Sequence, residues 1–233
     1  AIGAIALGLS GGLVQLAAAL GAMATLGLLF MLARRALFTR DALESEQGTT
    51  AVLLTGVMIA SFAAALLSLA LSLAPDARLR TMVFWLLGDL SGATDLRAAL
   101  IALAAIGVAF AIAQRHAAAL DLLVRGDLQA YTQGVRVAHT RRTLVLVAAL
   151  ATGAAVTLAG AVGFVGFVAP HLMRLVFGND QRFLLPASGL AGGTLVVLAD
   201  TVARSAFAPL QLPVGVLTAL IGAPVFLWLL ARR

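Results

Sequence analysis

The sequence predicts an all-α polytopic membrane protein. Of its 233 residues, 62% are hydrophobic and only 11% are charged, and the mean hydropathy is +1.05, which excludes a water-soluble globular fold. Apolar runs near twenty residues recur, and about twenty residues are what a helix needs to cross a bilayer core. Backbone amides in a bilayer must be hydrogen-bonded within their own segment, so these runs favour helices.

Seven full spans and one shorter helical remnant account for the apolar runs. The spans are expected at residues 13–33, 51–73, 98–113, 143–158, 162–177, 185–202 and 214–230. The chain is already apolar at Ala1, so we expect the remnant to end a helix whose start, with one or more preceding helices, is missing. Residues 77–97 contain only a short apolar stretch, which favours a re-entrant or interfacial helix. The polar stretch 114–142 is expected to form short surface helices within a single transmembrane domain over 1–233.

Missing residue types exclude several functions. All 16 basic residues are arginine, because the sequence contains no lysine, so a Walker A loop and a Schiff base are ruled out. Cysteine is also absent, which excludes disulfides, thiolate catalysis and cysteine-bound zinc. The arginines lie in short clusters between apolar runs, a pattern typical of topology signals rather than of nucleic-acid binding. We therefore expect no cofactor and no nucleic-acid partner.

Arginine counting predicts the orientation, because cytoplasmic loops carry the excess of positive charge. Twelve arginines fall on one set of helix ends, including the C-terminal pair. The other set has four, which are Arg78, Arg80, Arg97 and Arg204. The C-terminus is therefore expected in the cytoplasm, and Arg204 outside.

An ordered series of motifs resembles one permease family. The stretch from Gly163 to Leu175, GFVGFVAPHLMRL, resembles a signature of the FecCD-like permeases, which import iron-siderophores, haem and cobalamin with the help of an ATP-binding cassette ATPase. Further motifs follow the family's order at 54–57, 85–92, 184–186, 198–204, 212–215 and 221–226. The resemblance covers roughly residues 50 to 233, and family members have ten spans.

The resemblance implies the permease subunit of an ATP-driven importer, with no catalytic site of its own. It implies two copies of the chain in the bacterial inner membrane, an ATPase subunit bound inside and a periplasmic substrate-binding protein docked outside. The cargo is not identified, because siderophore, haem and cobalamin permeases share these motifs.

In the family, a cytoplasmic loop forms two short helices that press into the ATPase. Here that coupling loop is 122–135, and its candidate residues are Arg125, Gly126, Asp127, Leu128, Gln129, Ala130, Tyr131 and Gly134. Gly126 and Gly134 bracket a short helix with a left-handed exit at glycine. Asp127 and Tyr131 lie four apart and can share one helix face. The family usually has Gly-Glu and a small residue where this chain has Gly126-Asp127-Leu128.

Other positions have a functional and a structural interpretation. The family's counterpart of Arg204 meets an acidic residue of the binding protein, and its spacing from Asp200 also predicts an ion pair. Met82, Phe84 and Trp85 are candidates for lining the transport path, although methionine most often fills helix packing. His171 has no second ligand nearby in the sequence, so we expect no metal site.

The alternative function is an ion-coupled secondary transporter. Such proteins place ionisable residues at mid-membrane, and the predicted spans are nearly free of them apart from Asp200. An intramembrane enzyme is a third possibility, but no His-Glu cluster or Ser/His pair lies within the spans. An importer driven by a separate ATPase needs neither feature.

Overall fold

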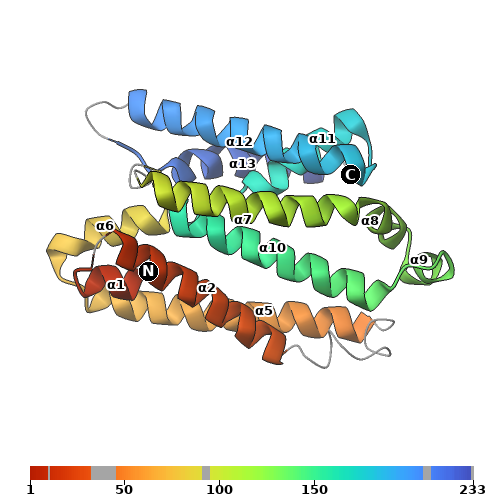
Figure 1. Cartoon of the computed structure of the whole chain (residues 1–233). Coiled ribbons are helices and arrows are strands. Elements are labelled where there is room, and N and C mark those ends of the chain that lie inside the picture. The colour runs from red at the N-terminus through yellow and green to blue at the C-terminus, as the bar shows by residue number, and fades with distance from the viewer. Residues whose placement is uncertain (10, 33–45, 91–94, 207–210, 232–233) are drawn as a thin grey trace. The chain divides into compact units, whose positions relative to one another are not determined.

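Helices make up the regular structure of the computed structural model, which describes residues 1–9, 11–32, 46–90, 95–206 and 211–231 (Figure 1). In chain order they are α1 (Ile2–Ala6), α2 (Gly12–Leu32), α5 (Glu46–Ser72), α6 (Asp76–Leu86), α7 (Leu96–Arg115), α8 (Ala117–Val124), α9 (Asp127–Thr132), α10 (Val137–Ala159), α11 (Val165–Phe177), α12 (Gln181–Ser205) and α13 (Val214–Ala231). These residues contain no strand. The predicted all-α class is confirmed.

Five of the seven predicted spans are helices long and apolar enough to cross a membrane, namely α2, α5, α7, α10 and α12. Of the other two, α11 is shorter than the predicted 162–177, whereas α13 has 18 residues and matches the predicted 214–230 closely. The apolar helix α11 has 13 residues, which at 1.5 Å per residue rise about 20 Å, and the apolar part of α13 that is described ends at Leu227. A bilayer core is about 30 Å thick, so seven full crossings are not confirmed.

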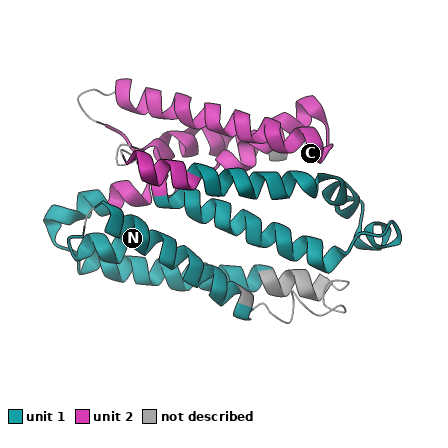
Figure 2. Cartoon of the chain, in the orientation of Figure 1, with its two compact units in different colours: residues 1–82, 103–157 teal, residues 83–102, 158–233 magenta. Residues whose placement is uncertain are grey.

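The described chain divides into two compact units (Figure 2). Unit 1 contains residues 1–82 and 103–157, and unit 2 contains residues 83–102 and 158–233. Each unit therefore combines two separate stretches of the sequence. The prediction of one transmembrane domain stays a prediction.

In unit 1, the N-terminal helix α1 is held by an arginine from a later segment. Ile2, Ala4 and Ile5 are buried, and the Arg78 guanidinium donates a hydrogen bond to the carbonyl of Ala6 at the end of α1. The last carbonyls of a helix have no partner inside the helix, and a cation there also complements the helix dipole. Arg78, which counted only as a topology signal in the sequence, thus has a structural role.

In unit 2, small residues let α11, α12 and α13 pack closely. A Cβ atom added to Gly192 of α12 would lie 3.2 Å from Val165 Cγ1 of α11. The rings of Phe167 and Phe226 lie 5.7 Å apart at an interplanar angle of 59°, which joins α11 to α13 through a tilted aromatic contact. Close approach through small residues is the usual way in which helices pack in lipid.

The segment 85–89, which includes the end of α6, also lies in unit 2, against two glycines. Its Asp89 N–H donates to the Ala159 carbonyl at 2.9 Å. A Cβ atom on Gly160 would lie 2.2 Å from the Trp85 carbonyl oxygen, and one on Gly215 would lie 1.9 Å from the Leu87 carbonyl oxygen. The backbone at 85–89 is therefore in direct contact with the end of α10 and the start of α13. That this segment is re-entrant or interfacial stays a prediction.

Candidate functional site

The predicted coupling loop forms two short helices, α8 and α9, which pack against each other in unit 1. Gly126 separates them with φ 121° and ψ 150°, a backbone conformation that is essentially restricted to glycine. Two consecutive helices can therefore change direction sharply here. Any other residue at 126 would strain this joint.

The end of α9 has the glycine exit that the sequence predicts. Gly134 has φ +84°, its N–H donates to the Tyr131 carbonyl at 2.9 Å, and the Val135 N–H donates to the Ala130 carbonyl at 3.0 Å. This pair of hydrogen bonds is a Schellman motif, which satisfies carbonyls that the helix itself leaves unpaired. The side chain of Ala130 is fully buried, so it fixes which side of α9 faces the protein.

The outward side of α9 carries two large apolar side chains. Leu128 is 78% exposed and Tyr131, the single tyrosine of the chain, is 69% exposed. They lie three residues apart, so they are neighbours on the helix surface. We call Leu128 and Tyr131 the α9 face. Exposed apolar groups gathered on one surface are typical of a partner-binding site.

Asp127, one helical turn before Tyr131, makes an ion pair with α10. Its Oδ1 accepts a hydrogen bond from Arg141 Nη2 at 2.7 Å, and the two side chains are 24% and 38% exposed. That Asp127 and Tyr131 share one docking face stays a prediction, and the structure adds that Asp127 pairs with an arginine of α10. Arg141 was missed, because helical periodicity says nothing about contacts across a turn.

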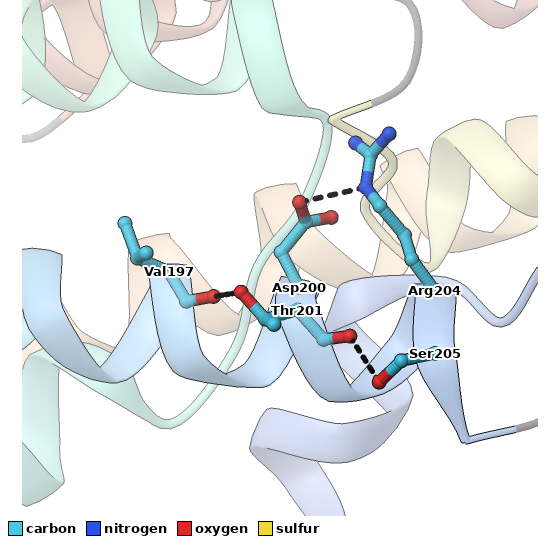
Figure 3. Close-up of polar contacts among 5 residues, drawn as sticks. All are labelled: Val197, Asp200, Thr201, Arg204 and Ser205. Carbon is cyan, nitrogen blue, oxygen red and sulfur yellow. Dashed lines mark hydrogen bonds and ion pairs between the residues drawn. The ribbon is translucent and has the colours of Figure 1, made fainter.

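The second candidate lies near the end of α12 (Figure 3). Arg204 Nε donates to Asp200 Oδ2 at 2.8 Å, which confirms the predicted ion pair, and the Arg204 side chain remains 44% exposed. The neighbouring hydroxyls bond to their own helix, Thr201 to the Val197 carbonyl and Ser205 to the Thr201 carbonyl, each at 2.8 Å. Of these groups, the guanidinium is thus the one suited to meet a carboxylate from outside.

The candidate path residues differ in burial. Met82 is fully buried, so it fills packing, the usual role of methionine. Phe84 and Trp85 are half-buried, and their place in a transport path stays a prediction. No cluster of three or more histidine, aspartate or glutamate side chains that could hold a metal ion occurs within the described ranges.

The GFVG motif has a feature that composition does not reveal. Phe164 has φ +65° and is the non-glycine residue with positive φ in the described part of the chain, an uncommon conformation for a bulky side chain. It precedes α11 as its N-cap residue. A Cβ atom on Gly222 of α13 would lie 2.4 Å from Phe164 Cβ, so the glycine in the motif at 221–226 makes room for this turn.

Comparison with known proteins gives similarities over most of the chain. A profile of the FecCD transport family matches residues 1–232. The cobalamin import system permease protein BtuC of Halobacterium salinarum is 42% identical over 203 residues, which are 85% of this chain and 53% of that protein. The vitamin B12 import system permease protein BtuC of Vibrio cholerae is 38% identical over 217 residues, 93% of this chain and 62% of that protein.

Two further similarities agree with these. The hemin transport system permease protein HmuU of Yersinia pestis is 38% identical over 182 residues, 78% of this chain and 54% of that protein. A solved structure described as an inward-facing conformation of a metal-chelate type ABC transporter superposes with a TM-score of 0.84 at 29% identity, and covers 100% of this chain and 71% of that one. The chain thus spans 53% to 62% of the length of the three permeases.

Proposed function

Because the chain belongs to the FecCD transport family, we propose that it forms the transmembrane path of an ATP-driven importer in the bacterial inner membrane. The observation that carries this proposal is the family match over residues 1–232, together with relatives named as cobalamin and hemin permeases. The cargo is accordingly a metal chelate such as cobalamin, haem or an iron-siderophore. Two copies of the chain enclose the path.

The energy source in this proposal is a separate ATPase subunit. The chain has no lysine for a phosphate-binding loop, and Asp200, the acidic residue of the predicted spans, is paired with Arg204 rather than left available to carry an ion. The first observation places ATP hydrolysis in another subunit, and the second disfavours the ion-coupled alternative.

We expect the purified full-length permease to hydrolyse no ATP by itself. In proteoliposomes with its cognate ATPase subunit and cargo-loaded binding protein, it should take up cargo only when ATP is present. Uptake driven by a proton or sodium gradient without ATP would contradict the proposal. Empty liposomes and a hydrolysis-deficient ATPase variant are the controls.

The ATPase docks on the cytoplasmic side at the α9 face in this proposal. Leu128 and Tyr131 project from a short helix outside the candidate spans, and they are the exposed apolar groups that an interface would bury. An aromatic anchor in a partner's cleft typically carries a large share of the binding free energy. Arg125, Gly126, Gln129 and Gly134 shape the surrounding loop.

The binding protein docks on the opposite side at Arg204. A thiol-labelling experiment tests on which side of the membrane each site lies, with Ser205→Cys beside Arg204 and Gln129→Cys on α9. Both positions are exposed, and the 233-residue sequence contains no native cysteine that would react. In right-side-out spheroplasts an impermeant thiol reagent should label position 205 and leave position 129 unlabelled. Soluble binding protein should protect position 205. The reverse labelling pattern would contradict the orientation, and absent protection would contradict docking at Arg204.

A further inference from the structure

We propose that the Asp127–Arg141 ion pair is a strut that makes the coupling helix α9 and the membrane-spanning helix α10 move together. This inference rests on the proposed function, because it assigns α9 to the ATPase. The inference goes beyond the proposed function by identifying how a displacement of α9 is transmitted to a membrane span. Arg141 is a positioning residue in this account, since it acts on the partner only through Asp127.

The helix α9 cannot hold its own orientation. It has six residues, far fewer than the roughly 12 to 15 that an isolated helix needs to be even marginally stable. It also lies between two glycines with positive φ, Gly126 and Gly134, whose backbones tolerate conformations closed to other residues. Contacts with neighbouring segments must therefore set its direction.

The described contacts at the two ends of α9 differ. The C-terminal end is closed by local hydrogen bonds within 130–135, which stabilise the turn but hold no distant segment. The N-terminal end carries Asp127, whose carboxylate reaches 14 residues along the chain to the Arg141 guanidinium. Buried Ala130 adds packing on the inner side of α9. The ion pair is thus a direct side-chain link between α9 and α10.

Arg141 belongs to a candidate membrane span. It lies one turn after the start of α10 at Val137, and α10, with 23 residues in all, is a candidate span. The preceding residue, Thr140, is only 5% exposed, so this part of α10 is anchored in the protein. A force that an ATPase applies to the α9 face would therefore pass through Asp127 and Arg141 to the end of a spanning helix.

The size of the effect follows from the exposure of the pair. A partly exposed ion pair typically stabilises a structure less than a buried one does. Breaking this pair should therefore shift the equilibrium between docked and mobile states of α9 by about two- to fivefold. Such a shift is small enough to leave folding intact. It is large enough to measure as mobility of α9.

The test is a charge-swap cycle in the full-length permease in nanodiscs, with a nitroxide spin label on Gln129→Cys of α9. Asp127→Asn and Arg141→Gln should each raise the mobile fraction of the label about two- to fivefold. The double variant Asp127→Arg/Arg141→Asp should return it to the parent value, because it rebuilds the pair with reversed signs. Arg136→Gln removes an exposed arginine that lies between the coupling loop and α10, and it should leave the mobile fraction of the label unchanged.

The same variants are then compared by cargo transported per ATP hydrolysed, which the single variants should lower and the swap should restore. The proposed link is contradicted if the label is as mobile in the swap variant as in the single variants, or if Arg136→Gln has the same effect as Arg141→Gln. These outcomes are separate from the fate of the proposed function. If the wild-type permease fails to bind an ATPase, the proposed function is wrong, whereas the label mobility still decides whether the pair holds α9.

Discussion

Gly215→Ala is expected to disrupt the packing of unit 2 strongly, because the added methyl group would meet backbone atoms. The new Cβ atom would lie 1.9 Å from the Leu87 carbonyl oxygen and 3.3 Å from that of Ala161. These are backbone atoms, so no side chain can rotate away. We expect a loss of about 3 kcal/mol, which for a protein of this size lowers the apparent Tm by about 6 to 12 °C. The apparent Tm is measured by size-exclusion chromatography of detergent-solubilised protein after heating.

The matched control is Gly193→Ala in α12. No atom lies within 4 Å of the Cβ that this change would add, and alanine is the better helix former by about 1 kcal/mol. The Tm of this variant should therefore stay the same or rise. An equal fall in Tm for both variants would mean that the close approach of 85–89 to α13 does not stabilise the protein.

Tyr131→Ala and Leu128→Ala are expected to weaken ATPase binding strongly without harming the permease itself. Both side chains are more than two-thirds exposed, so their removal costs the folded chain little. If they are buried in a cleft on the ATPase, each truncation should cost about 2 kcal/mol or more, which is roughly a 30-fold loss of affinity. The measurement is titration of the ATPase onto permease in nanodiscs.

Gln129→Ala is the control for this pair of variants. Gln129 is also exposed and lies on the same helix, but its side chain is polar and it is not part of the α9 face. Its truncation should change affinity by less than about threefold, as most interface-rim positions do. A loss equal to that of Tyr131→Ala would mean that the α9 face is not the anchor.

Hydropathy could predict most of the helices, because a span has to be apolar throughout. It placed the start of α10 at residue 143, whereas the helix begins at Val137. The extra turns contain Arg141 and Arg142, which are outside an apolar window but are good helix formers. The shorter helix α11 was overestimated for the opposite reason, since residues 162–164 are apolar but form the turn with the unusual Phe164 backbone.

The site could be predicted where it depends on local rules. The helix between Gly126 and Gly134 follows from glycine's conformational freedom, and the Asp200–Arg204 pair follows from a spacing of four on a helix. Neither rule reaches across a turn, which is why the Asp127–Arg141 pair was not predicted. The contacts of Gly160 and Gly215 with the 85–89 backbone were missed for the same reason, because close approach between distant segments leaves no periodic signal in one sequence.

The central claim is that an ATPase drives transport by docking on the α9 face. The most direct measurement is ATP-dependent cargo uptake by proteoliposomes that contain wild-type permease or the Leu128→Ala/Tyr131→Ala double variant, at an ATPase concentration that just saturates the wild type. The account predicts that the double variant inserts and dimerises normally, and that its uptake falls at least tenfold and recovers when excess ATPase is added. Wild-type rates in the double variant at the limiting concentration would contradict it.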